Sequence, residues 1–267
     1  MVEIPDSHPR KRSLLSRQKI VEGSHRGLLA DSAMIAHGRG EAFDYMLGER
    51  TTDSARLAIR ESASRLRAAN NPVISVNGNT VLLAGKGALR LAAVIGCPIE
   101  VNLYYRTPER VAGLLSLLED QRKAVAEEEA PIGFEGEWLG TVNAVTLLGG
   151  SPDFRIQGLE GPRSHCTEKG IGVAETILVP LEDGDRCEAL VNLDKEVIVI
   201  DLNPLSRSSK MATVTIVDEV SRAFDGILAA LLDPDEMGYD EWDNDFVLKE
   251  ALREMSSLVS DSSTPTL

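Results

Sequence analysis

Long apolar runs are absent from this sequence of 267 residues. The best candidate, residues 81–99, is interrupted by Lys86 and Arg90, so it falls short of the roughly 20 consecutive apolar residues that span a bilayer. The first residues, MVEIPDSHPRKRSLLS, also lack the apolar centre of a signal peptide. We therefore expect a cytoplasmic protein without a membrane segment.

Cysteine and positive charge are also scarce. The three cysteines, Cys97, Cys166 and Cys187, are widely spaced and form no CxxC pair, which excludes a disulfide framework and gives no zinc motif. The net charge of −14 argues against general binding to nucleic acid. Such a charge suits a cytosol rich in salt, although an ordinary acidic protein fits the composition equally well.

The common nucleotide-binding and hydrolase motifs are missing as well. The sequence has no GxxxxGK[ST], which excludes a P-loop protein, and no GxGxxG between a strand and a helix, which weakens a dinucleotide interpretation. It also has no GxSxG, and no Ser-His-Asp arrangement is apparent.

Helices and short apolar strands alternate along most of the chain. Apolar spacing and capping residues predict helices over residues 10–33, 53–69, 80–95, 108–123 and 219–232. Apolar runs predict strands at 73–76, 98–105, 143–149, 175–181, 196–201 and 212–218. Strands that are apolar on both faces and alternate with helices predict a three-layer α/β domain around a mainly parallel sheet.

The composition changes after Asp233. We expect one α/β domain over residues 1–232, with a helical N-terminal part at about 10–69. Residues 233–267 are acidic and end in SSLVSDSSTPTL, so we expect a peripheral extension that is partly disordered.

Polar segments follow four of the predicted strands. Asn77-Gly78-Asn79 follows the first, and residues 102–106, with Tyr104 and Arg106, follow the apolar start PIEV of the second. Residues 182–186 and 201–207 follow two later strands. Each segment alone could be a capped turn, but the carboxyl ends of parallel strands meet at one edge, where ligands bind. The coincidence therefore predicts one polar cleft.

The segment IAHGRGEAFDY, residues 35–45, is too irregular for one clean element. Gly38 and Gly40 flank Arg39, so the backbone there could approach a ligand while the guanidinium meets an anion. His37 could hold a phosphate or carry a proton. The alternative is a turn that breaks a helix and carries a solvated arginine.

Six blocks of the sequence together resemble the archaeal phosphopantothenate synthetase family. They read IPDSHPRKRSLLSRQKIVEG, IAHGRGEAFDYMLGE, NNPVISVNGN, IEVNLYYRTPERV, VPLEDGDRCEALV and VIVIDLNPLSRSSKMATVTIVD, and they cover roughly residues 1–230. The resemblance implies a Rossmann-like homodimer. It also implies that ATP condenses 4-phosphopantoate with β-alanine through an acyl adenylate, releasing AMP and diphosphate. The acidic end has no counterpart in the family pattern, and Cys187 replaces a common threonine.

The resemblance also implies roles for particular residues. Those expected to bind the nucleotide are Arg17, Arg39, Glu182, Asp183, Gly184, Arg186, Cys187, Asp201, Leu202 and Asn203. Those expected on the phosphopantoate side are Asn77, Asn79, Tyr104 and Arg106, with His37, Arg39 and Arg155 in catalysis. Whether the acidic loop contacts a ribose or Mg²⁺ stays open.

Two other classes of function remain to be weighed. A nucleotide-dependent oxidoreductase or hydrolase could use the same cleft, but the missing dinucleotide fingerprint weakens it. A nucleotide-sensing module could use the acidic end as a partner surface, but sensing needs fewer arginines. We therefore expect a ligase that uses ATP and Mg²⁺.

Overall fold

The computed structural model describes residues 4–181 and 183–257. Within them, six parallel strands form one sheet in the order β3-β2-β1-β6-β7-β8. The strands are β1 (Pro72–Val76), β2 (Ile99–Val101), β3 (Leu147–Leu148), β6 (Thr176–Pro180), β7 (Glu196–Ile200) and β8 (Val214–Ile216). The chain therefore builds the sheet outward from its centre in two directions.

The order in which the chain adds strands reverses between the neighbouring strands β1 and β6. These two strands run parallel, and Val73 is paired with Ile177. This is the strand order of Rossmann-type sheets, and such sheets bind ligands in the crevice at the reversal point. The expected Rossmann-like fold is confirmed, and it places the crevice beyond Val76 and Pro180.

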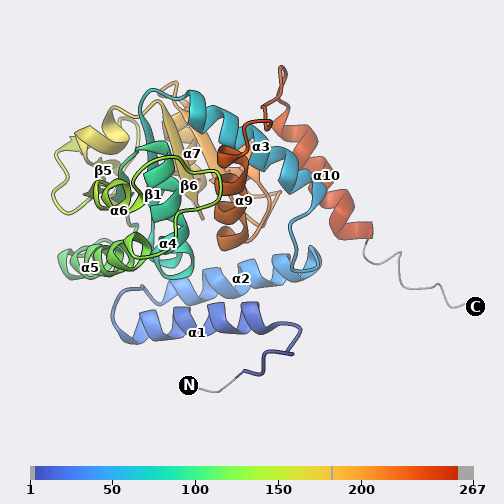
Figure 1. Cartoon of the computed structure of the whole chain (residues 1–267), viewed down its shortest axis with the longest axis horizontal. Helices are drawn as coiled ribbons and strands as arrows, with labels where there is room; N and C mark the ends of the chain where they lie inside the picture. The colour runs from blue at the N-terminus through green and yellow to red at the C-terminus, as the bar shows by residue number, and fades with distance from the viewer. Residues whose placement is uncertain (1–3, 182, 258–267) are drawn as a thin grey trace, which may run out of the picture.

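Alternate residues of the strands face opposite sides of the sheet. Ile74 and Leu178 pack in one apolar cluster, whereas Val73 and Ile177 pack in another. The first side is covered by α3 (Asp53–Ala68), α4 (Gly78–Ile95), α5 (Pro108–Ala126) and α9 (Val220–Leu232), and the second by α7 (Gly184–Val191) and α8 (Arg207–Met211) (Figure 1). The expected three layers are therefore present.

Local capping fixes where several helices begin. Thr107 Oγ1 accepts from the backbone N–H of Arg110 at 3.2 Å, and Pro108 occupies the first turn. Asn77 Oδ1 accepts from the N–H of Thr80 at 3.0 Å, at the start of α4. These caps can be predicted from the sequence because each joins residues only three positions apart.

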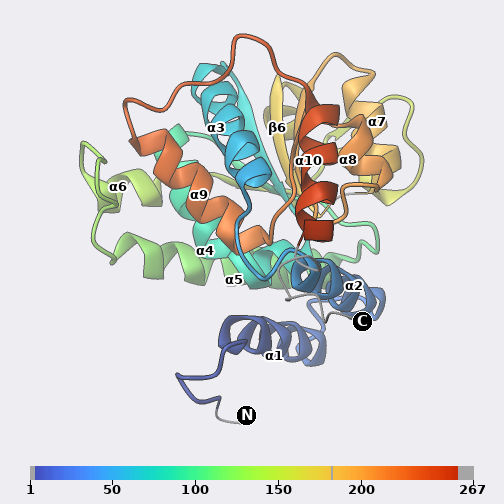
Figure 2. The ribbon, with the colours of Figure 1, turned by 90° about the vertical axis from the view of Figure 1, so that its right-hand side faces the viewer.

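The N-terminal segment is a helical hairpin, which the sequence only partly predicted. The helix expected over residues 10–33 ends early, as α1 (Lys11–His25), because Gly27 adopts φ +71° and turns the chain. The segment expected to be irregular is the helix α2 (Ser32–Met46). Figures 1 and 2 show both helices below the sheet, with α2 between α1 and the rest of the fold.

Three expected strands are several residues shorter than predicted, and the one expected at 212–218 covers only Val214–Ile216. The strand at 98–105 covers only Ile99–Val101, and that at 143–149 only Leu147–Leu148. The predicted first residue of the latter, Asn143, is the last residue of α6 (Trp138–Asn143). Between β3 and β6 the chain forms a small antiparallel ribbon of β4 (Phe154–Arg155) and β5 (His165–Cys166). The same stretch contains the single turn η1 (Pro162–Ser164) and the π-helical turn η2 (Glu168–Gly172).

The acidic C-terminal extension is not confirmed as a separate element. Its helix α10 (Asn244–Ser257) buries Val247, Leu248 and Ala251 and lies beside α3 and α8 in Figure 2. Asn244 Oδ1 accepts from the N–H of Thr215, on the edge strand β8, at 2.7 Å. This helix therefore covers the sheet edge that β8 would otherwise expose.

Candidate active site

A cavity of about 1100 Å³ opens at the carboxyl edge of the sheet. It is lined by the hairpin α1–α2 and by the segments that follow β1, β2, β6 and β7. Ten of the residues expected in the site line it: His37, Arg39, Asn77, Asn79, Tyr104, Asp183, Arg186, Asp201, Leu202 and Asn203. The fold thus brings together residues from distant segments in a space large enough for a nucleotide and a second substrate.

Other expected residues lie outside the cavity lining. Arg17 forms an ion pair with Glu41, a lining residue, at 2.6 Å. Arg106 donates to the carbonyl of Gly149, and Arg155 Nε donates to Ser164 Oγ at 3.1 Å, so protein atoms engage both guanidinium groups. Gly184 and Cys187 also do not line the cavity, and Glu182 lies outside the described residues.

Gly184 and Cys187 both pack against α8 and the residues beside it. A Cβ on Gly184 would come within 2.6 Å of the Arg207 side chain, so the glycine permits close packing of α7 on α8. Cys187 is fully buried, and its Sγ donates to the carbonyl of Ser208 at 3.5 Å. The side chain of Cys187 therefore lies in the core, and its expected nucleotide contact stays a prediction.

Burial also predicts that the thiols are inert in the folded protein. It raises the pKa of Cys97, Cys166 and Cys187 to about 12, so almost no thiolate exists at pH 8. We expect mass spectrometry to find almost no modification by iodoacetamide within an hour at pH 8, and complete modification in 6 M guanidinium. Rapid labelling of Cys187 in the folded protein would contradict its buried position.

His37 lies in the cavity wall with one ring nitrogen available. Its Nε2 is buried and has no hydrogen-bond partner among the described residues. Burial lowers the pKa of His37, while the nearby carboxylates of Glu41 and Glu219 oppose that effect and Arg17 adds to it. The imidazole is therefore neutral near pH 7 and can accept a proton.

Arg39 faces the loop that follows β7. Its side chain is exposed, and within residues 4–181 and 183–257 it has no hydrogen bond or ion pair, although its charge acts on Asp201. Asp201 Oδ2 accepts from Ser206 Oγ at 2.6 Å and Oδ1 from the N–H of Asn203 at 2.9 Å. Burial raises the pKa of Asp201 despite these bonds. The loop is thus rigid, while the guanidinium of Arg39 is available to an anion.

Two asparagines close the inner end of the cavity. Asn77 Nδ2 donates to the carbonyl of Leu181 at 2.9 Å, which ties the segment after β1 to the segment after β6. Asn79 is 8 % exposed and donates to the carbonyl of Ala33 at 3.1 Å. Its Oδ1 has no partner in the described part of the chain, so it offers an acceptor to a ligand.

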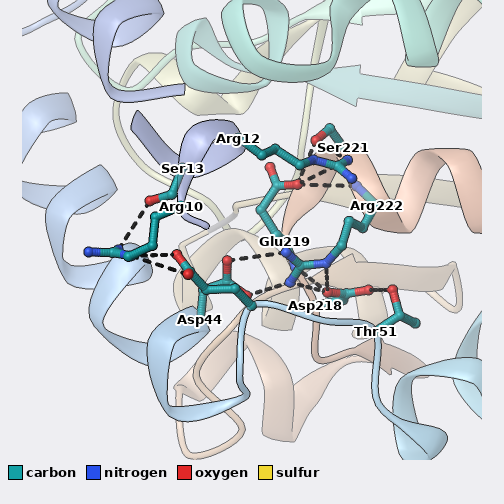
Figure 3. Close-up of polar contacts among 10 residues, drawn as sticks. Arg10, Arg12, Ser13, Asp44, Thr51, Asp218, Glu219, Ser221 and Arg222 are labelled. Carbon is teal, nitrogen blue, oxygen red and sulfur yellow. Dashed lines mark hydrogen bonds and ion pairs between the residues drawn. The ribbon is translucent and has the colours of Figure 1, made fainter. Parts of the chain in front are cut away.

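Buried charges that sequence reasoning missed connect the hairpin to the sheet. Arg222, at the start of α9, donates to Asp218 Oδ1 at 2.8 Å and to Asp44 Oδ2 of α2 at 3.2 Å (Figure 3). Thr51 Oγ1 also donates to Asp218, at 2.6 Å. Figure 3 shows Arg12 of α1 beside Glu219 in the same group. These residues are far apart in the sequence, so no local pattern could have identified the network.

A metal site made of protein groups alone is not present in the described residues, because no three His, Cys, Asp or Glu side chains converge. Asp185 is ion-paired with Arg207, and both oxygens of Asp201 accept hydrogen bonds. Asp183 lines the cavity with more than half of its side chain exposed. It fits Mg²⁺, which is commonly held by one or two carboxylates and by substrate phosphates.

The fold and the cavity define an α/β protein of the Rossmann type, with a cavity that includes arginines in its lining at the reversal point of the sheet. Residues 54–258 match the model of the family described as phosphopantothenate/pantothenate synthetase, and the chain belongs to this family. The match reaches residue 258, so the expectation that the family pattern ends near residue 230 is wrong.

Relatives from archaea agree with that assignment. The chain is 49% identical to the 4-phosphopantoate–β-alanine ligase of Thermococcus onnurineus, over 84% of this chain and 78% of the relative. It is 44% identical to the ligase of that name from Methanospirillum hungatei, over 88% of both chains, and 46% identical to that of Methanosarcina mazei, over 84% and 79%. None of the described helices has the length and apolarity to cross a membrane.

Proposed function

We propose that this protein is an ATP-dependent ligase that joins 4-phosphopantoate to β-alanine and gives 4′-phosphopantothenate, AMP and diphosphate, a step in coenzyme A biosynthesis. The names of the relatives support the two substrates. The observation that carries the proposal is the cavity at the carboxyl edge of the sheet, whose lining includes Arg39, Asp201 and Asn79. A cytoplasmic location and a homodimer remain predictions.

In the proposed reaction, a carboxylate oxygen of 4-phosphopantoate attacks the α-phosphorus of ATP, and the bond to diphosphate breaks. Arg39 stabilises the negative charge that develops on the phosphates, and such a contact is commonly worth 10² or more in rate. The loop at Asp201–Asn203 holds the nucleoside, with Asp201 accepting from a ribose hydroxyl. Mg²⁺, held by Asp183 and the phosphates, would supply further neutralisation of charge.

The second half of the reaction requires a free amine. β-Alanine enters as an ammonium ion, which must lose a proton before its nitrogen attacks the acyl carbon and AMP leaves. The imidazole of His37 lines the cavity, its Nε2 has no partner among the described atoms, and in the proposed reaction it accepts that proton. The carboxylates of Glu41 and Glu219 stabilise the resulting imidazolium ion.

The function is tested by omitting each substrate in turn. We expect AMP and diphosphate in equal amounts when ATP, Mg²⁺, 4-phosphopantoate and β-alanine are all present, measured by chromatography. Omission of β-alanine should leave at most one equivalent of AMP bound as acyl adenylate, because the amine alone opens that intermediate. Release of ADP and inorganic phosphate instead would show that the acid is activated by phosphorylation and would contradict the proposed route.

A further inference from the structure

One wall of the cavity belongs to a segment with little regular structure. This segment, residues 154–172, contains the two-residue strands β4 and β5 and the short turns η1 and η2, and we call it the ribbon segment. Its residues 159–163 line the cavity, and Gly161 turns the chain there with φ +79°. A ribbon of two strands is marginally stable at best by itself, so other contacts must hold this wall in place.

The ribbon segment packs on the side of the sheet that α7 and α8 also cover. Ile156 and Ile171 are buried in the same apolar cluster as Val73 of β1. Glu100 of β2 is paired in register with Ser75, which lies two residues after Val73. Because alternate residues of a strand point to the same face of the sheet, the side chain of Glu100 faces the ribbon segment.

Glu100 is completely buried, and its carboxyl group binds the ribbon segment. Its Oε1 accepts from the backbone N–H of Thr167 at 2.7 Å, and its Oε2 accepts from that of Ile171 at 2.9 Å. A Cβ on Gly170 would clash with Oε2, so glycine at this position permits the close approach of the carboxyl group. A carboxyl group buried in an apolar layer is costly unless its oxygens are hydrogen-bonded, and here both oxygens are bonded to this one segment.

Asn102 holds the same segment closer to the cavity. Its side chain belongs to a residue that is 2 % exposed, and Nδ2 donates to the carbonyl of His165 at 3.0 Å and to that of Arg163 at 3.3 Å. Arg163 is the last residue of the wall at 159–163, so this contact reaches the cavity lining directly. Glu100 and Asn102 thus satisfy four backbone groups of the ribbon segment between them.

We propose that Glu100 and Asn102 are positioning residues for ligands bound in the cavity, an inference that rests on the proposed function. Both side chains lie outside the described cavity lining, so they act through the backbone that they hold. Their hydrogen bonds fix the wall at 159–163 before a ligand arrives, and binding therefore does not have to order it. Arg39 and His37 lie on α2 and do not depend on this anchoring.

The first test measures hydrogen exchange in the whole protein. Glu100→Gln keeps the size of the side chain but sets an amide NH₂ group against one of the two backbone N–H groups. We expect peptides from residues 154–172 to exchange about tenfold faster or more, because a backbone N–H loses its acceptor. Peptides from β6 and β7 should exchange as in the wild type. Unchanged exchange of the ribbon segment would overturn the proposal.

The second test separates KM from kcat in steady-state rates. We expect Glu100→Gln to raise the KM of at least one substrate by about tenfold or more and to change kcat by less than about threefold, because a displaced wall weakens binding while Arg39 and His37 stay in place. Asn102→Leu keeps a branched side chain but leaves two carbonyls without their donor, so it should act in the same direction. It also replaces Glu100→Gln if that variant does not fold.

Glu61→Gln is the matched control. Glu61 is also buried, and its Oε2 accepts from the backbone N–H of Tyr239 at 2.9 Å, but it lies on α3, away from the described residues that line the cavity. This variant should lower the melting temperature and leave every KM unchanged. Unchanged KM values in Glu100→Gln and Asn102→Leu would make both residues merely structural and overturn the proposal.

The proposed function can fail separately from the positioning role. A wild-type protein that forms no 4′-phosphopantothenate would overturn the function. Calorimetric binding of Mg²⁺-ATP and of 4-phosphopantoate to the same variants would then decide the role of Glu100 and Asn102. Weaker binding of either ligand to Glu100→Gln than to Glu61→Gln would support the positioning role, and equal binding of both ligands would overturn it.

Discussion

Replacement of Arg39 by alanine is expected to lower the turnover of the ligase reaction by at least about 10²-fold without unfolding the protein. The guanidinium lines the cavity and, among described residues, has no hydrogen bond or ion pair to lose, so its removal leaves no buried partner uncompensated. What is lost is stabilisation of charge on the phosphates as the bond to diphosphate breaks. The measurement is the steady-state rate of AMP release, with a thermal melt of each variant.

Two further variants sharpen that experiment. Arg39→Lys should recover part of the rate, because an ammonium ion keeps the charge but not the two-pronged hydrogen bonds. Arg26→Ala removes an exposed arginine after α1, on the same hairpin but outside the cavity lining, and should leave the rate unchanged. Near-normal kinetics for Arg39→Ala would show that this residue does not contact the phosphates.

Replacement of Arg222 by glutamine is expected to lower the free energy of unfolding by about 3–5 kcal/mol, because Asp44 and Asp218 would be left buried without their cation. The side chains of all three are at least 89 % buried, so solvent cannot substitute for the lost charge. Since Arg222 ties α2 to the sheet, the KM for ATP should also rise. Urea denaturation and initial rates measure the two effects.

The pH dependence of the free energy of unfolding gives a second test of Arg222→Gln. Burial already raises the pKa of Asp44, and Arg222 opposes that shift. Without Arg222 the pKa of Asp44 in the folded protein rises further above its unfolded value, so protonation of Asp44 stabilises the variant more than the wild type as the pH falls. The deficit against wild type should therefore shrink toward pH 5, and Asp44→Asn in the same background should reduce it at pH 7.

A surface ion pair provides the control for Arg222. Arg56 pairs with Asp53 three residues away on α3, and both side chains are mostly exposed. Arg56→Gln should change the free energy of unfolding by less than about 1 kcal/mol. If Arg222→Gln were equally mild, the buried network would not hold the hairpin in place.

Expectations drawn from local patterns agreed well with the structure. Thr107 and Pro108 mark the start of α5, and the apolar runs at β6 and β7 lie within one residue of their predicted limits. The prediction that the segment IAHGRGEAFDY is irregular was wrong, for a physical reason. A Cβ at Gly38 would meet nothing within 4 Å, so its glycine reflects open surroundings on a regular helix and not a turn.

The sequence by itself determined the alternation of helices and strands, the parallel sheet and a set of polar segments that follow strands. These features depend on residues a few positions apart, whose spacing and capping can be recognised directly in the sequence. Only the tertiary structure decided that Cys187 faces the core, that α10 packs on β8, and that Arg222 is paired with both Asp44 and Asp218. Those facts depend on burial and on contacts between distant segments, which are fixed only when the whole chain packs.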